Sequence, residues 1–282
     1  MGLNVDTRNT ANGTFELGHT EERRSESKAS IEALLGSGGP IKTKSLEQLH
    51  GRLVWFRSFV FGRKLNWAVR VVSKFSRTHE KRVGLTDSLV AALKCLDGFL
   101  STCQNVKVGV DISATWVVFT DGAYEPDQNF PATVGGVLVN PQGQVVSYFV
   151  EVLPQSLLSE FLEASRHPIY ELEIFPVVIA VRLWAKHLAG NFVVHYLDNN
   201  AALGAFIRAD SATELGKALL KGYLDFEERL KLRPWFARVP SHSNLSDAPS
   251  RLDFTSVYLR DAAKSEPSLP AHLADWGISR VR

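Results

Sequence analysis

Four acidic residues in the second half of the sequence could do chemistry together. Asp121 and Asp198 each follow a run of residues typical of a β-strand, Glu173 lies in a segment with helical periodicity, and Asp247 follows the last strand-like run. Carboxylates gathered at one place repel one another, and hard divalent cations relieve that repulsion. Two such ions about 4 Å apart can activate a water molecule and stabilise the leaving oxygen in phosphodiester hydrolysis. The residue types therefore allow a metal site, provided that the fold brings distant residues together.

Three of these acids also have an ordinary explanation, whereas Glu173 does not. An Asp before Gly122 or Asn199 is a common turn former or helix cap, and Asp247 could be a plain loop residue. Glu173 shares a helical face with apolar residues, and a carboxylate there is costly unless a partner such as a metal ion is present. The other positions on that face are Ile169, Leu172, Pro176, Val177, Ala180, Trp184 and Leu188.

Two neighbours of Glu173 bear on its role. Glu171 is the alternative acid, but at two residues' distance it points off the face of Glu173. Pro176 lacks a backbone N–H, which a helix tolerates only in its first turn or at a kink. We therefore expect the helix to begin only shortly before Glu173, which places this carboxylate near the edge of the sheet.

The elements that must position these acids alternate between strands and helices. Strands are predicted over 115–120, 133–140, 144–153, 192–197 and 235–239, and helices over 173–188, 200–209 and 213–230. The turn residues Asn140-Pro141-Gln142-Gly143 predict a hairpin between the second and third strands. The apolar run 192–197 is typical of a central strand that is buried on both faces. The order β-β-β-α-β-α-α-β predicts a mixed α/β fold.

The chain divides near residue 108, and the part before it is predicted to be helical. Thr20 is a candidate cap for a helix that runs to Leu35, and the capping-box sequence Ser45-Leu46-Glu47-Gln48 is expected to start a second helix. A third helix is expected after Thr86. Basic side chains are spread through the second helix and the segment after it. They form either a solvated helix face or a surface that binds the phosphates of nucleic acid without reading its sequence. The candidates for such contacts are Arg52, Arg57, Arg63 and Lys64.

Composition sets broad limits. The 282 residues carry a formal net charge of +2, so any nucleic-acid footprint must be local. The two cysteines, Cys95 and Cys103, fit neither a disulfide framework nor a zinc site. The sequence shows no signal peptide and no apolar run of membrane-spanning length. We therefore expect an intracellular protein of the cytoplasm or nucleus that is neither secreted nor bound to a membrane.

Several short segments together resemble a known family. They are Val117-Val118-Phe119-Thr120-Asp121-Gly122-Ala123, Gly135-Gly136-Val137-Leu138, Glu173 in its helix, Tyr196-Leu197-Asp198-Asn199-Asn200-Ala201-Ala202 and Asn244-Leu245-Ser246-Asp247-Ala248-Pro249-Ser250-Arg251. In this order they resemble the type 1 ribonuclease H domain of retroelement reverse transcriptases. The upstream segment 45–55, with Gly62-Arg63 after it, resembles the entry to the polymerase thumb. A Tyr-x-Asp-Asp-type polymerase motif is missing from the sequence, so we expect no DNA synthesis from this chain.

The resemblance implies a fold and a division of the chain. Residues 1–107 would be a helical region like the thumb and connection of a reverse transcriptase. Residues 108–254 would be a ribonuclease H-like domain, with a mixed five-stranded sheet flanked by helices, and residues 255–282 a polar tail. The chain would then be the C-terminal part of a retrotransposon polyprotein.

The resemblance also implies a site and a reaction. Asp121, Glu173, Asp198 and Asp247 would be the catalytic carboxylates that bind two Mg²⁺ or Mn²⁺ ions. The substrate would be the RNA strand of an RNA–DNA hybrid, with no membrane and no small-molecule cofactor involved. His242 is the candidate for a loop histidine that helps product to leave. Asn199 and Asn244 are further candidate contacts to nucleic acid, whereas His195 is expected to be a packed core residue.

Three other interpretations compete with this one. A decayed retroelement fragment would fold, and bind nucleic acid or not, without cutting it. A proofreading exonuclease of the same fold would need an Asp-x-Glu on the first strand, where position 123 is Ala. A transposase would need its Glu last in the sequence, whereas Glu173 comes second of the four acids. The last two interpretations are therefore disfavoured.

Overall fold

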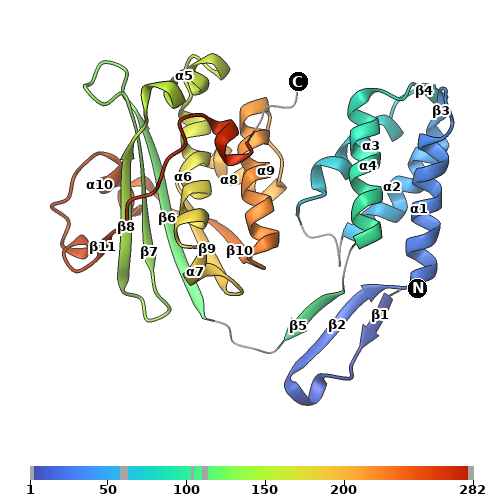
Figure 1. Ribbon diagram of the computed structural model, residues 1–282, viewed down its shortest axis with the longest axis horizontal. Coiled ribbons are helices and arrows are strands. Elements are labelled where there is room, and N and C mark those ends of the chain that lie inside the picture. The colour runs from blue at the N-terminus through green and yellow to red at the C-terminus, as the bar shows by residue number, and fades with distance from the viewer. Residues whose placement is uncertain (1–2, 58–62, 103–104, 110–113, 279–282) are drawn as a thin grey trace. The chain divides into compact units, whose positions relative to one another are not determined.

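The computed structural model describes residues 3–57, 63–102, 105–109 and 114–278. The chain forms two compact units, residues 1–112 and 113–282, and each is described here by itself (Figure 1). No helix among the described residues has both the length and the apolar character needed to cross a membrane. Gly62 of the thumb-like segment and Cys103 lie outside the described residues.

A six-stranded mixed sheet forms the centre of the C-terminal unit. Its order is β10-β9-β6-β7-β8-β11. Strands β6, β7 and β8 are antiparallel neighbours, whereas β9 is parallel to β6, β10 to β9 and β11 to β8. The bounds are β6 Thr115–Tyr124, β7 Ala132–Val139, β8 Val145–Val152, β9 Phe192–Leu197, β10 Arg233–Arg238 and β11 Ala263–Lys264. The predicted mixed α/β class is confirmed, and β11 adds a sixth strand to the five expected.

Helices flank this sheet, and α6 packs against β6 and β7 on one side and against α8 and α9 on the other (Figure 1). Every residue of α6 from Glu171 to Val181 is buried, as expected of a helix that is covered on all sides. The bounds are α5 Gln155–Ala164, α6 Ile169–Leu183, α7 Ala185–Leu188, α8 Asn200–Arg208, α9 Glu214–Arg229 and α10 Asp247–Ser250, with 3₁₀ turns η2 Ser241–Ser243, η3 Val257–Leu259 and η4 Leu273–Trp276.

The start of α6 differs from the expectation drawn from Pro176. The helix begins at Ile169, four residues before Glu173, so Pro176 lies inside it. Because proline has no N–H, the carbonyl of Leu172 four residues earlier receives no helical hydrogen bond from it. The predicted single helix to residue 188 is also divided, since Trp184 separates α6 from α7.

Two glycines let helices approach the sheet closely on both faces. A Cβ atom at Gly122 would lie 2.3 Å from the carbonyl oxygen of Leu172 in α6. A Cβ atom at Gly135, which pairs with Asp121 across the β6–β7 ladder, would lie 2.7 Å from the backbone nitrogen of Ser250 in α10. Only glycine therefore allows α6 and α10 to pack at these points without a shift of the backbone.

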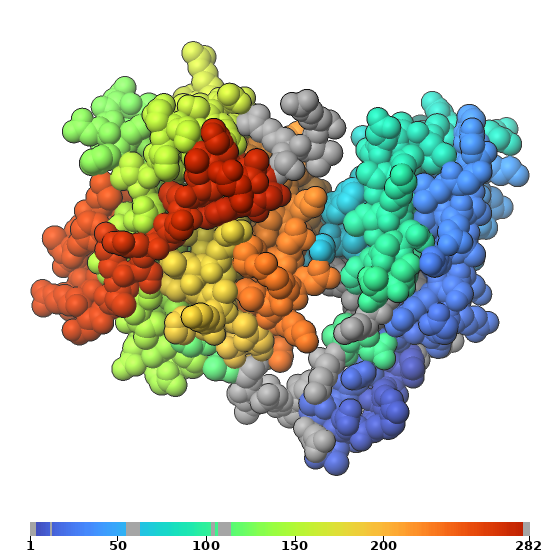
Figure 2. All heavy atoms as spheres, in the orientation of Figure 1, coloured from blue at the N-terminus to red at the C-terminus, as the bar shows by residue number. Residues whose placement is uncertain are grey.

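The segment after residue 254, expected as a polar tail, is part of the C-terminal unit. Strand β11 pairs with β8, and Leu259 of η3 packs against Val137 and Val139 of β7. Leu273 and Ile278 are buried in the main core. Figure 2 shows the segment in red, lying along the surface of the unit. The segment was expected to be a tail because most of its residues are polar, and its few buried apolar residues do not stand out in the sequence.

The N-terminal unit contains helices and two small sheets, not helices alone. The helices are α1 Glu21–Leu35, α2 Thr43–Arg57, α3 Asn66–Ser76 and α4 Asp87–Thr102. Strands β1 Leu3–Asp6, β2 Thr14–His19 and β5 Val106–Gly109 form one antiparallel sheet, and β3 Ile41–Lys42 pairs with β4 Arg82–Val83; η1 spans Thr10–Asn12.

All three helix starts predicted for this unit can be compared with the structure, and the start after Thr86 is confirmed, because α4 begins at Asp87. Thr20 is the N-cap residue of α1, as predicted, although its side chain makes no cap hydrogen bond. The prediction that Ser45 caps the second helix is wrong, because α2 already begins at Thr43. Leu46, Leu49 and Leu53 of α2 are buried and form its apolar face.

Gly122→Ala should destabilise the protein by about 1–3 kcal/mol, because its methyl group meets backbone atoms of α6 that cannot move freely. Urea unfolding followed by circular dichroism measures this. The matched control is Gly98→Ala, at an exposed helical site where a Cβ meets nothing within 4 Å; there we expect a gain of up to about 1 kcal/mol. Equal stability of Gly122→Ala and the parent protein would contradict the close approach of α6 to β6.

Candidate metal centre

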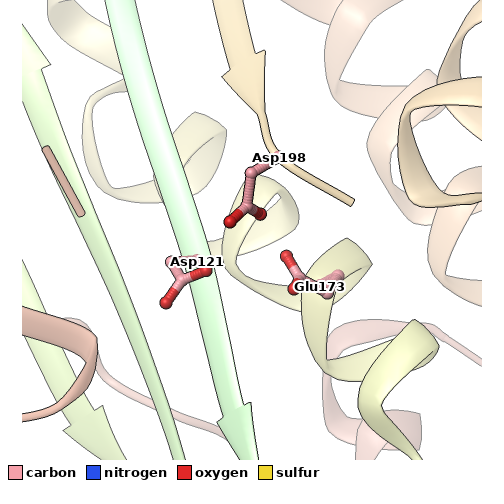
Figure 3. Close-up of side chains that lie close together, drawn as sticks. All are labelled: Asp121, Glu173 and Asp198. Atoms are coloured by element: carbon pink, nitrogen blue, oxygen red, sulfur yellow. The ribbon is translucent and has the colours of Figure 1, made fainter. Parts of the chain in front are cut away.

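Three of the four predicted carboxylates come together in the structure. Asp121 belongs to β6, Glu173 to α6, and Asp198 directly follows β9. Each offers one oxygen, and these three oxygens lie within 4.8 Å of one another. In Figure 3 the three carboxyl groups lie around a common space. Residues far apart in the sequence thus form one acidic cluster, called here the acidic triad.

The parallel pairing of β6 and β9 explains why the two aspartates meet. Phe119 of β6 pairs with Tyr196 of β9, and each aspartate lies two residues beyond that pair on its own chain. Strand β6 continues to Tyr124, so Asp121 lies within the strand and not, as was predicted, after it, whereas β9 ends at Leu197, directly before Asp198. Because the two strands run in parallel, the end of β9 brings Asp198 beside Asp121. Helix α6 brings the third acid, since a Cβ atom at Gly122 would lie only 3.2 Å from the backbone nitrogen of Glu173.

Burial makes the charge of the triad costly. Asp121 and Glu173 are only 4% and 6% exposed, whereas Asp198 is half-buried. Burial, and then the charges of Asp121 and Asp198, raise the pKa of Glu173 from 4.5 to about 9. Burial also raises the pKa of Asp121 from 3.8 to about 6, against a hydrogen bond from Ser250 that lowers it. The charges of Asp198 and Asp247 add to the rise for Asp121.

A second observation, separate from the charges, also suits a divalent cation: two oxygens of the triad are buried without a hydrogen-bond partner in the described part of the chain. Oε2 of Glu173 and Oδ1 of Asp198 are buried and have no hydrogen-bond partner among the described residues. Buried polar atoms normally have a partner, so each such oxygen needs an explanation. Carboxylate oxygens are the ligands that hard cations such as Mg²⁺ prefer. The triad is therefore consistent with divalent metal binding.

Asp247 lies near the triad but outside the group of three. It is the first residue of α10, and its Oδ1 accepts a hydrogen bond from Nε of Arg251 at 3.0 Å. Nη1 of Arg251 also pairs with Glu125, at 3.3 Å. The charge of Asp247 still raises the pKa of Asp121, so the two groups interact. In this structure Asp247 thus has an arginine as its partner.

Ser250 and Asn244 hold the last loop against β6. The hydroxyl of Ser250 donates to Oδ2 of Asp121, and Nδ2 of Asn244 donates to the carbonyl of Thr120 at 3.2 Å. Oδ1 of Asn244 accepts from the backbone and the hydroxyl of Ser246. Asn244 was expected to contact nucleic acid, but it is 4% exposed and its amide is used inside the protein. Its structural role is to position the loop that carries Asp247.

Ser250 was not foreseen as a site residue. A serine within Asp247-Ala248-Pro249-Ser250 carries no signal of its own, because only the fold shows that it is fully buried beside Asp121. The one available signal was its spacing of three residues from Asp247, which places both on one turn of a helix.

Other predicted residues have clear positions. Glu171 accepts a hydrogen bond from the hydroxyl of Thr213 at 2.7 Å and so lies outside the triad, as its helical position suggested. His195 is buried, and its ring stacks on Phe236. His242 is exposed in η2, five residues before Asp247.

The remaining candidates are Asn199 and the basic residues. Asn199 is the N-cap of α8, where its Oδ1 accepts hydrogen bonds from the backbone of Ala201 and Ala202. Arg52 donates from Nη1 to the hydroxyl of Ser30 at 2.5 Å. Arg63 and Lys64, both half-buried, precede α3, and Arg57 is the last residue of α2. All four basic candidates belong to the N-terminal unit.

Comparison with solved structures finds ribonucleases H and viral reverse transcriptases. The RNase H1 of the archaeon Halobacterium salinarum is 18% identical over 49% of this chain and 95% of its own, with a TM-score of 0.37. The N-terminal RNase H domain of a Mycobacterium tuberculosis protein is 18% identical over 49% of this chain and 92% of its own, with a TM-score of 0.33. A foamy viral protease–reverse transcriptase, solved with an RNA/DNA hybrid, is 17% identical over 92% of this chain, with a TM-score of 0.30. This chain spans 31% of that viral protein. No protein-family model matches the chain, and neither does any curated protein.

Glu173→Gln should stabilise the metal-free protein at pH 8, by about 1–3 kcal/mol. The folded protein keeps a proton on Glu173 that the unfolded chain releases, since the pKa is raised from 4.5 to about 9. The contribution of this group to the free energy of unfolding is therefore fully present below pH 4.5 and falls as the pH rises from 4.5 towards 9. Thermal unfolding in a chelator at pH 5 and pH 8 measures the difference, which should be smaller at pH 5.

The same melts with added Mg²⁺ or Mn²⁺ provide the complementary measurement. A cation that binds only the folded state should raise the melting temperature of the parent protein and much less that of Glu173→Gln. The control is Glu171→Gln, a buried acid outside the triad, which should keep the full response to metal. An equal response of the parent protein and Glu173→Gln would remove Glu173 from the metal centre.

Proposed function

We propose that this chain is a metal-dependent endonuclease of the ribonuclease H type, which hydrolyses the RNA strand of RNA–DNA hybrids. The observation that carries the proposal is the acidic triad, with two buried oxygens that have no partner among the described residues. The choice of an RNA–DNA hybrid rests on the sequence resemblance of segments 117–123, 196–202 and 244–251 to ribonuclease H domains of reverse transcriptases. The thumb-like segment 45–55 supports a retroelement origin.

The residues of the triad would hold two Mg²⁺ or Mn²⁺ ions. When bound, such ions lower the pKa of a coordinated water molecule and stabilise charge on the leaving oxygen. Glu173 and Asp198 supply the unpartnered oxygens, and Asp121 is oriented by the hydroxyl of Ser250. Buried, close-packed positions fix Asp121 and Glu173, so little reorganisation is needed when the substrate arrives.

Asp247 is proposed as the fourth ligand and His242 as a helper in product release. For ligation, Asp247 would give up its ion pair with Arg251. His242 suits a mobile contact because it is exposed on the turn that leads to Asn244 and Asp247. Asn199, beside Asp198, is the proposed contact to the nucleic-acid strand near the site. The basic residues Arg52, Arg63 and Lys64 are proposed to contact phosphates without reading sequence.

Asp121→Asn and Asp198→Asn should each reduce hybrid cleavage on the order of 100-fold or more, because each removes a charged ligand for the cations. A labelled RNA–DNA hybrid, compared with RNA–RNA and DNA–DNA duplexes, measures rate and substrate choice in Mg²⁺ or Mn²⁺. Glu171→Gln should cleave like the parent protein. Cleavage that survives Asp121→Asn would disprove the assigned site. A folded parent protein that cuts no hybrid with either metal would indicate a retroelement fragment that folds or binds nucleic acid without catalysis.

The pairing of Asp247 with Arg251 should set the metal requirement. Arg251→Gln removes a cation near Asp121 and frees Asp247, so half-maximal cleavage should need several-fold less Mg²⁺ at pH 8. Asp247→Asn should need several-fold more. Titration of Mg²⁺ at fixed hybrid concentration measures both variants. If both variants shift the requirement in the same direction, Arg251 does not compete with metal for Asp247.

A further inference from the structure

The N-terminal unit contains a groove whose lining includes Arg52, one of the residues proposed above to contact phosphates. It has a cavity volume of about 400 Å³ and lies between α1 and α2, next to the β3–β4 pair. Figure 1 shows β3 and β4 at the end of α1. The apolar part of its lining comes from Leu34, Ile41 and Leu49, which are buried in the core of this unit. The volume is within the range of small-molecule sites.

The polar part of the lining is cationic. Lys42, Arg52 and Arg82 line the groove, together with the hydroxyls of Ser30 and Ser45. None of the residues described as lining it is acidic. The side chains thus offer a concentration of hydrogen-bond donors and positive charge around one small space.

The register of β3 and β4 brings two of these cations together. Lys42 pairs directly with Arg82 across the two strands. Like charges at directly opposite positions destabilise a strand pair. Within the described ranges 3–57 and 63–102 of this unit, neither Lys42 nor Arg82 forms an ion pair. An anion bound between them would relieve this repulsion, which gives an argument for a ligand separate from the shape of the groove.

The arginines are held in place without using up their donors. Nη1 of Arg52 donates to the hydroxyl of Ser30 across the groove at 2.5 Å, and Nη1 of Arg82 donates to the carbonyl of Pro40 at 3.2 Å. A guanidinium group has five N–H donors, so each of these bonds uses one and orients the rest. Of the α2 residues that line the groove, Ser45 lies in the first turn, where the helix dipole favours negative charge.

We propose that this groove binds the phosphate group of a ligand no larger than about a mononucleotide. Arginine and lysine together are the usual partners of phosphate, and the volume of the groove leaves room for the non-phosphate part. The phosphate could come from a free mononucleotide or from the 5′ end of a nucleic-acid strand. The proposal does not depend on the metal centre, because all its residues belong to the N-terminal unit.

Isothermal titration calorimetry of the full chain with inorganic phosphate, AMP and adenosine tests the proposal. We expect saturable binding of phosphate and tighter binding of AMP, with none for adenosine. Lys42→Gln and Arg82→Gln should each weaken AMP binding about 10-fold, as expected for loss of one charge-assisted contact. The matched control is Lys44→Gln, an exposed lysine in the first turn of α2 that does not line the groove; it should bind AMP as the parent protein does.

Two further measurements complete the test. A short 5′-phosphorylated oligonucleotide, compared with the same strand bearing a 5′-hydroxyl, distinguishes a strand end from a free nucleotide as the source. The ligand-free Lys42→Gln protein should melt at or above the temperature of the parent, because a repulsion is removed. No binding of phosphate or AMP by the folded parent would overturn the proposal, as would equal weakening in all three variants or equal binding of adenosine and AMP.

Discussion

The burial of acidic side chains close to one another is the constraint on which the candidate metal centre depends. Asp121 and Glu173 are nearly inaccessible to solvent, and the pKa of each is raised first by burial and then by its acidic neighbours. A fold without a use for these charges would gain stability by replacing them with amides of the same shape. Their gathering where β9 ends beside β6 is consistent with a divalent cation, which would convert this cost into binding free energy.

The surrounding packing holds the acids together against that repulsion. Gly122 admits α6 on one face of β6, and Gly135 admits α10 on the other face beside Asp121. Asn244 ties the last loop to the backbone of β6, and Ser250 donates directly to Asp121. Each of these contacts joins segments more than a hundred residues apart, except for that of Gly122 with α6. The site is therefore a property of the completed sheet, and no isolated segment of the chain can form it.

The sequence predicts what depends on local pattern and misses what depends on packing. Asp121 and Asp198 were identified because both follow strand-like runs, and parallel strands deliver their ends to one edge. Glu173 was found because a charge within an apolar helical face conflicts with burial. The early start of α6 before Pro176 and the packed segment after residue 254 were missed, since tertiary contacts overcame a weak local signal. Ser250 was missed, because its role comes from its hydrogen bond to Asp121, which only the completed fold reveals.

Both units bring side chains of like charge together, but the electrostatic cost of doing so differs between them. The acidic triad gathers like charges that a cation would relieve, and the groove lined by Lys42 and Arg82 gathers like charges that an anion would relieve. Burial raises the pKa values of Asp121 and Glu173 most, and repulsion by the neighbouring acids, acting through a medium of low dielectric constant, adds to the rise. Lys42 and Arg82 are exposed, and water and salt screen their charges. The free energy available from relieving repulsion is therefore larger at the metal centre, and binding in the groove must draw more on hydrogen bonds and shape than on charge alone.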